Sequence, residues 1–209
     1  MADMAIVQND NTDGAKRQQI LDGAKLCFLA QGFDGASMND IVKAAGVSKG
    51  TVYAYFPSKD KLFEALIYRD RRRQAEQAVV IEDENLPVER VLEELATRFS
   101  RLYNNAETIA YLRLVIAAAD RFPEIGRAFY EAGPAYGIIK IADYFQRKMD
   151  DGTLVKADPR LAAMQFVELV QCGLIKPRLF ASEAISGNYT AETVAKAGIA
   201  LFLKGMTAG

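Results

Sequence analysis

The stretch from Ser37 to Lys61, SMNDIVKAAGVSKGTVYAYFPSKDK, gathers side chains suited to binding a polyanion. Lysines neutralise phosphates and hydroxyls hydrogen-bond to them, while a glycine lets backbone come close to a ligand. The chemistry expected here is contact with the phosphates of double-stranded DNA. The candidate contact residues are Ser37, Lys43, Ser48, Lys49, Gly50, Thr51, Tyr53, Tyr55 and Lys59.

Two short helices joined by a tight turn would position these side chains. Ser37 has Asp40 three residues later, the capping-box spacing that favours a helix start. Gly46 suits the positive φ of a sharp turn, and Ser48 caps a second helix that ends near Tyr55. The pattern predicts a helix-turn-helix, whose second helix can lie in the major groove of DNA.

The charge of the chain supports this interpretation only when it is divided by segment. The total is −1, from 26 basic and 27 acidic residues. Residues 16–61 hold seven basic and four acidic residues, a local charge of +3, whereas residues 1–15 hold three Asp and no basic residue, a charge of −3. The positive field is therefore confined to the segment that holds the turn.

The composition argues against catalysis and metal binding. The chain has no His, so it has neither a Ser-His-Asp or Cys-His pair nor a His-based zinc site. It also lacks the side chain best suited to acid–base work near neutral pH. We expect no enzyme activity, no catalytic residue, no metal and no cofactor.

The cysteines and apolar runs indicate a cytoplasmic protein. Cys27 and Cys172 do not make a disulfide framework, and both are expected to be free and buried. The longest apolar runs, such as Leu114–Ala119 and Ala197–Leu203, fall short of the roughly 18 residues of a membrane span. The first residues carry Asp and no basic n-region, so we expect neither a signal peptide nor a membrane partner.

Helical periodicity runs through almost the whole chain and strand signals are nearly absent. The prediction is an all-α fold of about nine or ten helices, with an N-terminal three-helix unit and a larger C-terminal bundle. The expected helices are Lys16–Gln31, Ser37–Gly46, Ser48–Tyr55, Lys59–Ile81, Pro87–Asn104, Ala106–Arg121, Pro123–Asp150 with a break at Gly133-Pro134, Pro159–Ala181 and Ala191–Met206.

Over Arg17–Leu66 the chain resembles the DNA-binding domain of the TetR family of bacterial transcriptional repressors. The resemblance is carried by ILDGAKLCFLAQGFDGAS, by IVKAAGVSKGTVYAYF and by the PSKDKLF start of the next helix. In similar proteins, operator contacts, mostly to phosphates, are made by the residues that match Ser37, Lys49, Thr51, Tyr53, Tyr55 and Lys59. The chain departs from the common pattern at Val42, where a small Ala is usual, and at Tyr55, where His is frequent.

The polar composition of residues 1–14 predicts a flexible arm, and the resemblance implies a helix-turn-helix domain (15–60) and an effector-binding and dimerisation domain (61–209). Leu112–Pro134 is also weakly similar to the C-terminal region of the AefR-like subgroup. The family pattern implies a homodimer paired through the last two long helices. The wide apolar faces of those helices favour pairing too, although the same residues would also suit a core within one chain. The candidate interface residues are Ala163, Phe166, Val167, Val170, Val194, Ala197 and Leu201.

Aromatic residues cluster in the middle helices, where most should be core and a subset could line an apolar pocket. The candidate effector residues are Phe99, Tyr103, Tyr111, Arg113, Phe129 and Tyr136. Arg113 interrupts an apolar face, and a structural ion pair is favoured for it over contact with an acidic effector.

Together these features predict a repressor that leaves a palindromic operator when a small apolar or amphipathic effector binds. Two alternatives stay open: a dimeric helical binding protein with a vestigial DNA-binding unit, and an enzyme that works without His. The sequence does not identify the effector.

Overall fold

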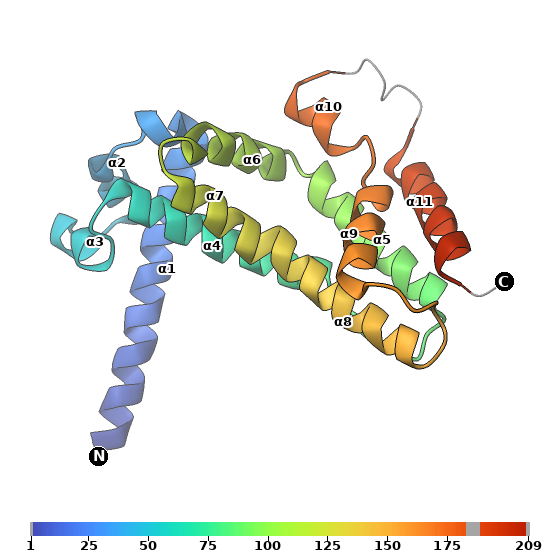
Figure 1. The fold of residues 1–209 in the computed structure, drawn as a ribbon. Helices are drawn as coiled ribbons and strands as arrows, with labels where there is room; N and C mark the ends of the chain where they lie inside the picture. Colours follow the sequence, from blue (N-terminus) through green and yellow to red (C-terminus); the bar gives the residue numbers. More distant parts are fainter. Residues whose placement is uncertain (1, 183–188, 208–209) are drawn as a thin grey trace. The chain divides into compact units, whose positions relative to one another are not determined.

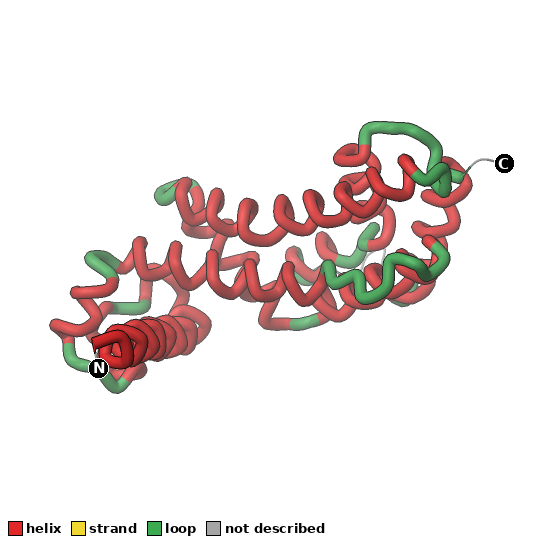
Figure 2. Tube along the Cα trace, turned by 90° about the horizontal axis from the view of Figure 1, so that it is seen from below, coloured by secondary structure: helices red, strands yellow, loops and turns green. Residues whose placement is uncertain are grey.

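A computed structural model describes residues 2–182 and 189–207, with the backbone alone for residues 2–12. The described chain consists of helices and loops and contains no strand (Figure 2), which confirms the all-α prediction. None of its helices is long and apolar enough to cross a membrane. In chain order (Figure 1) the helices are α1 (Ala2–Gly35), α2 (Met38–Ala45), α3 (Lys49–Tyr55), α4 (Lys59–Ala78), α5 (Val88–Asn104), α6 (Ala106–Ala119), α7 (Pro123–Tyr130), a π-helical turn (Glu131–Ala135), α8 (Tyr136–Asp150), α9 (Pro159–Val170), α10 (Ile175–Leu179) and α11 (Ala191–Met206).

The chain forms two compact units. The N-terminal unit comprises residues 1–70 and 114–129, and the C-terminal unit comprises residues 71–113 and 130–209. The boundaries fall inside α4 and α6, so each of these helices contributes residues to both units. The N-terminal unit thus extends past the predicted limit at residue 60 and recruits α7, which is distant in sequence.

Helix α1 begins at Ala2, well before the predicted start near Lys16. No Pro interrupts residues 2–15, and the single Gly14 is tolerated within the helix. Near its other end, Gly32 adopts φ 74°, ψ 174° and breaks the helix where the sequence predicts its end. The flexibility expected for residues 1–14 stays a prediction.

An aromatic cluster fills the core of the N-terminal unit. The Phe28 ring lies 4.6 Å from Phe63 of α4. Phe33 lies 5.1 Å from Phe63 and 5.2 Å from Phe122, measured between ring centroids. An ion pair of 2.9 Å joins Arg121 and Asp34, the sequence neighbours of Phe122 and Phe33. These contacts fasten the α6–α7 segment to the helices that carry the candidate DNA-binding residues.

The core of the C-terminal unit is built from α5, α8, α9 and α11. Phe145, Phe166 and Phe202 pack there with ring centroids 5.1–5.9 Å apart, and all three are buried. Helices α9 and α11 approach closely at Gly198, where an added Cβ would stand 2.8 Å from the Leu169 carbonyl. Only glycine allows the two backbones to come so close.

The predicted break at Gly133-Pro134 takes the form of a π-helical turn that joins α7 to α8. Pro134 has no N–H to donate, and its ring would clash with a carbonyl in a regular α-helix. The wider π turn accommodates the ring, and the helical path continues.

The prediction of one helix over Pro159–Ala181 is wrong. Helix α9 ends at Val170, a turn with Gly173 at φ 73° follows, and α10 is a separate short helix. The apolar character that suggested one helix continues through the turn. The left-handed glycine, however, cannot continue an α-helix.

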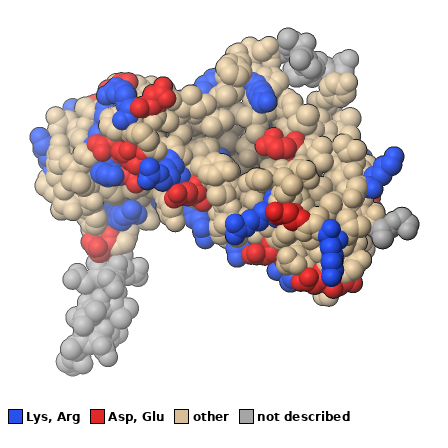
Figure 3. All heavy atoms as spheres, in the orientation of Figure 1, with Lys and Arg blue, Asp and Glu red and all other residues tan. Residues whose placement is uncertain are grey.

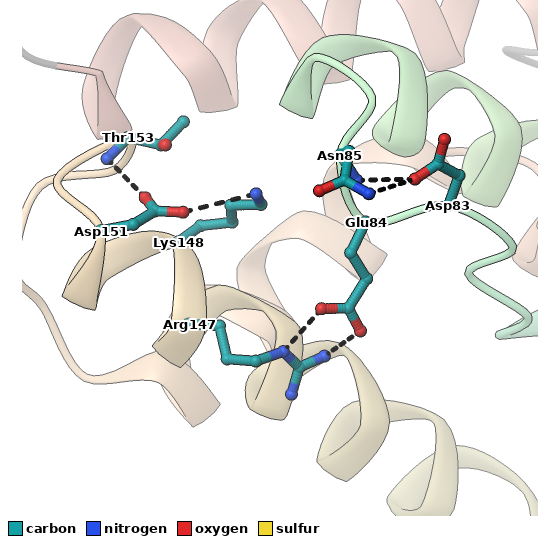
Figure 4. Close-up of polar contacts among 7 residues, drawn as sticks. All are labelled: Asp83, Glu84, Asn85, Arg147, Lys148, Asp151 and Thr153. Atoms are coloured by element: carbon teal, nitrogen blue, oxygen red, sulfur yellow. Dashed lines mark hydrogen bonds and ion pairs between the residues drawn. The ribbon is translucent and has the colours of Figure 1, made fainter.

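Polar contacts fix the α4–α5 connection to α8 within the C-terminal unit (Figure 4). Arg147 donates from Nε and Nη2 to the two carboxylate oxygens of Glu84, at 2.9 and 2.6 Å. Asp83 accepts from the backbone N–H and the side chain of Asn85, which closes the turn between them. These contacts order the loop that carries Asp83–Asn85.

Candidate nucleic-acid interface

Helices α2 and α3 form the predicted helix-turn-helix. The Ser37 hydroxyl accepts from Asp40 N–H while the Asp40 carboxylate accepts from Ser37 N–H, which completes the capping box. Gly46 adopts φ 63°, and its N–H closes the end of α2. Ser48 caps α3 by accepting from Thr51 N–H at 3.0 Å. All three local predictions are confirmed.

Helix α1 is the support on which α2 is placed. A Cβ added to Gly23 of α1 would stand 2.6 Å from the Ala45 nitrogen, so the helices touch through backbone. Gln19 of the same helix donates from Nε2 to the Ala45 carbonyl at 2.7 Å. Ile41 and Val52 are fully buried beneath the turn. Sequence reasoning missed Gln19 and Gly23, because their partners lie more than twenty residues away.

Four of the candidate contact residues are exposed on α2 and α3: Lys43, Lys49, Gly50 and Tyr53. The Lys49 ammonium lies 5.8 Å from the centroid of the Tyr53 ring, so the two side chains share one patch. A Cβ on Gly50 would meet nothing closer than the Ser48 hydroxyl at 3.8 Å, which leaves the backbone open to an approaching ligand. We call these four exposed residues the reading face.

The hydroxyls of Ser37, Ser48 and Thr51 are already engaged within the unit. Ser37 Oγ donates to Asp40 at 2.6 Å, and Ser48 Oγ lies 2.7 Å from Thr51 Oγ1. The bonds from Ser37 lower the pKa of the Asp40 carboxyl, because they favour its charged form. These residues therefore shape the helix starts, with lone pairs left over for other contacts.

The side chains of Lys59 and Tyr55 also make hydrogen bonds within the protein. The Lys59 ammonium donates to the carbonyls of Phe33, Asp34 and Ala36, at 2.7, 3.3 and 3.0 Å. All three of its N–H donors are thereby used at the end of α1. The Tyr55 hydroxyl donates to the Asp13 carboxylate, which raises the pKa of Tyr55. For both side chains the predicted phosphate contact would require giving up an internal bond.

Basic and acidic side chains are interspersed on the face that Figure 3 draws. Several basic residues of the N-terminal unit are paired, including Lys61 with Glu64 at 2.7 Å and Arg69 with Asp22 at 2.8 Å. Lys43 and Lys49 have no ion pair among the described residues. Two basic side chains of the reading face are therefore not neutralised by a carboxylate of the described chain.

Five of the six candidate effector residues belong to the C-terminal unit, and their sharing of one pocket stays a prediction. Phe99 and Tyr111 are buried, and Tyr103 and Tyr136 are half-buried in the C-terminal unit. Phe129 belongs to the N-terminal unit instead. Burial raises the pKa of the Tyr103 phenol, against a lowering effect of Arg71.

Arg113 hydrogen-bonds to backbone carbonyls at the end of α10. Its guanidinium donates from Nε to the Leu179 carbonyl at 3.1 Å and from Nη2 to the Arg178 carbonyl at 2.8 Å. Arg178 in turn donates to the Tyr103 carbonyl at 2.7 Å. Arg113 forms no ion pair among the described residues, because the end of α10 offers it two backbone acceptors.

A groove of about 1020 Å³ lies elsewhere in the C-terminal unit, between the end of α9, α10 and α11. The described residues that line it are mainly apolar, with two cations, Lys176 and Arg178, and no carboxylate. Cys172 lines it and is exposed, against the expectation of two buried cysteines, whereas Cys27 is buried. Three predicted interface residues, Val194, Ala197 and Leu201, line the same groove.

The predicted interface residues on α9 need correction. Ala163, Phe166 and Val170 are at most 1% exposed and lie in the protomer core, so they have no surface to offer a partner. Val167 is half-buried against that core. The apolar side chains that α9 does expose are Leu161 and Met164, at 49% and 41%. The single wide apolar face predicted for α9 therefore divides between core and surface.

Two family descriptions match the chain. Residues 20–66 match "Bacterial regulatory proteins, tetR family", and residues 90–205 match "AefR-like transcriptional repressor, C-terminal domain". The first span covers the helix-turn-helix, and the second covers more than half of the chain.

Individual relatives agree with these matches. "HTH-type transcriptional repressor Rv1474c" of Mycobacterium tuberculosis is 44% identical over 61 residues, 29% of this chain and 33% of that protein. The chain thus matches about a third of this curated relative's length. Among solved structures, a putative TetR-family regulator from Mesorhizobium loti has a TM-score of 0.81 at 28% identity, covering 94% of this chain and 98% of that one. "Flavonoid-responsive Regulator FrrA" has a TM-score of 0.79 at 31% identity, covering 93% and 98%.

Proposed function

Because the chain belongs to the TetR family of bacterial regulatory proteins and is a helix-turn-helix DNA-binding regulator of that type, we propose that it represses transcription as a homodimer on a near-palindromic operator. The observation that carries this proposal is the reading face, an exposed set of Lys43, Lys49, Gly50 and Tyr53 on a capped helix-turn-helix. Two copies would place two α3 helices in successive major grooves.

The surface of α9 and α11 supports the dimer. Leu161, Met164 and Leu201 are 49%, 41% and 61% exposed, and Leu201 also lines the apolar groove. A two-fold axis pairs the same patch on both copies, so one apolar face suffices for a closed interface. We infer that this outer face, with Val194 and Ala197, meets the second copy.

Buried polar atoms in the C-terminal unit suggest the chemistry of an effector. Thr108 and Gln171 are 2% and 9% exposed, and Thr108 Oγ1 and Gln171 Oε1 have no hydrogen-bond partner among the described residues. Tyr103 adds a half-buried phenol. A hydroxylated aromatic ligand would bury its rings and donate to Gln171 Oε1, and the name of the relative FrrA points to the same class.

Effector binding would act through α4 and α6. Residues of both helices belong to both units, so a ligand that prefers one arrangement of their C-terminal-unit residues would change the placement of the reading face. The change in operator affinity equals the difference in effector affinity between the two states.

The decisive experiment is a titration of DNA from upstream of the protein's own gene at several salt concentrations. Saturable binding that weakens with salt supports the proposal, and Lys49→Ala should weaken it and reduce the salt slope by about one. Lys140→Ala, at an exposed position on α8, is the matched control and should leave the slope unchanged. If the wild type shows no saturable binding there or to selected operators, the vestigial alternative is favoured.

The effector class is tested on the protein–operator complex. A hydroxylated flavonoid should release the DNA, and the parent flavone without hydroxyls should release it less. Gln171→Leu, which removes the unpaired acceptor, should reduce the difference between the two compounds. Equal release by both compounds would contradict the role given to Gln171.

A further inference from the structure

The Tyr55 hydroxyl, for which the sequence predicts a phosphate contact, has an acceptor within the protein. It donates to the Asp13 carboxylate, and it lies 3.4 Å from the Asp13 carbonyl oxygen. Tyr55 is the last residue of α3, and Asp13 lies on α1, 42 residues earlier. One phenol has one proton to donate, so the carboxylate and a phosphate cannot both accept it.

We propose that Asp13 acts as an internal competitor for the operator phosphate at Tyr55 and so lowers the operator affinity of the repressor. The inference rests on the proposed function and on the phosphate contact that the family resemblance implies for Tyr55. A carboxylate is an anionic oxygen acceptor like a phosphate, and it suits the same hydroxyl. DNA binding must therefore replace one charge-assisted hydrogen bond with another instead of adding a new one.

The charge of the segment adds to this effect. Residues 1–15 carry three Asp and no basic residue, a charge of −3, directly before residues 16–61, whose charge is +3. Asp13 is exposed and carries one of these three negative charges, which repels a phosphate that approaches Tyr55. The bond to Asp13 also raises the pKa of Tyr55, which keeps the hydroxyl protonated and able to donate.

The structure distinguishes this role from a purely structural one. The α2–α3 pair is already fixed by the capping box, by Gly46 and by the Gln19–Ala45 bond. Arg17, one turn after Asp13, lies over the Phe56 ring at 5.4 Å and holds the end of α3 to α1 independently. Removing the Asp13 carboxylate should therefore free Tyr55 without displacing the reading face.

The test is a double-mutant cycle on operator binding by the full-length protein. Asp13→Ala should tighten binding about three- to tenfold, and Asp13→Asn, which keeps a neutral acceptor, should tighten it less. In a Tyr55→Phe background the same Asp13→Ala change should give little or no gain. Asp10→Ala removes an equal charge from the same helix, and its effect should not depend on residue 55.

Each result has a separate meaning. Unchanged or weaker binding by Asp13→Ala, or an equal gain with and without the Tyr55 hydroxyl, would overturn the proposal. An absence of operator binding by the wild type and by Asp13→Ala would instead refute the proposed function. Weak wild-type binding that Asp13→Ala restores through Tyr55 supports both.

Discussion

Gly23 of α1 and Ala45 of α2 touch backbone to backbone. A Cβ on Gly23 would stand 2.6 Å from the nitrogen, 2.7 Å from the Cα and 2.8 Å from the Cβ of Ala45. Contacts this short with backbone cannot be relieved by rotating a side chain. The position of the whole helix-turn-helix on its support therefore depends on one missing methyl group.

Replacing Gly23 with Ala should push α2 away from α1. We expect a loss of about 1–3 kcal/mol in the free energy of unfolding, the usual cost of overpacking, measured by urea denaturation. Operator binding should weaken as well, because the reading face moves. Gly35→Ala is the control, since its added Cβ would meet only the Gln31 Cβ at 3.5 Å. Equal stability of the two variants would contradict this account.

Lys59 should matter more for stability than for phosphate binding. Lys59→Met keeps the aliphatic stem but leaves the carbonyls of Phe33, Asp34 and Ala36 without their shared donor. We expect a loss of about 1–3 kcal/mol by urea unfolding and an unchanged salt slope of operator binding. Lys61→Met, which breaks only an exposed pair with Glu64, should change stability little. If Lys59→Met instead reduces the salt slope by about one, Lys59 contacts an operator phosphate.

Features that depend on local signals could be predicted from the sequence. The caps at Ser37 and Ser48 and the turn at Gly46 depend on residues three or four apart, so their types alone predict the structure. The same holds for the limits of α5 and α11, which follow from periodicity and flanking residues.

Features that depend on distant partners could not be predicted. The amphipathic pattern of α9 cannot say which apolar residues face its own core, and Ala163, Phe166 and Val170, which the sequence predicts at the dimer interface, lie in that core. The hydrogen bonds of Lys59 to three backbone carbonyls likewise depend on where α1 ends in space. Such choices arise from tertiary packing, which a single sequence does not display.

Acid should weaken the N-terminal unit through Asp40. The bonds from Ser37 hold the pKa of the Asp40 carboxyl below its usual value. The ionised carboxylate therefore stabilises the fold fully above the unfolded-state pKa near 3.8, and this stabilisation is lost as the pH falls through the lower folded-state pKa. Both Asp40→Asn and Ser37→Ala should make the fall of Tm between pH 5 and about pH 2 shallower. A wild-type slope in both variants would show that the capping box carries no pH dependence.

Leu201 should control the oligomeric state. Its side chain is 61% exposed on α11 and lines the groove, so Leu201→Glu would place a charge in the proposed interface. We expect monomers by sedimentation analysis, with the helix content retained in circular dichroism. Ile139→Glu, at a 47% exposed site on α8 outside that face, should stay dimeric. A Leu201→Glu variant that stays dimeric would show that the interface does not include Leu201.

Tyr144 carries a hydroxyl whose removal should stabilise the protein. The residue is fully buried in the C-terminal unit, and its hydroxyl has no hydrogen-bond partner among the described residues. Tyr144→Phe keeps the ring and removes the unpaired group, so we expect a gain of about 1 kcal/mol and a higher Tm. Tyr136→Phe, at a half-buried position, is the control and should change stability less.

Alkaline pH gives the Tyr144→Phe variant a second readout. Burial, with a smaller effect of Glu84, raises the pKa of Tyr144 to about 12, from 10.0. Because the folded-state pKa lies above the unfolded one, the unfolded phenol loses its proton first, and the wild type loses stability as the pH rises from 10 toward 12. Tyr144→Phe has no such proton to lose, so its Tm should fall less steeply above pH 10 in thermal unfolding followed by circular dichroism. Parallel wild-type and variant curves would mean that the phenol is accessible to solvent in the folded state.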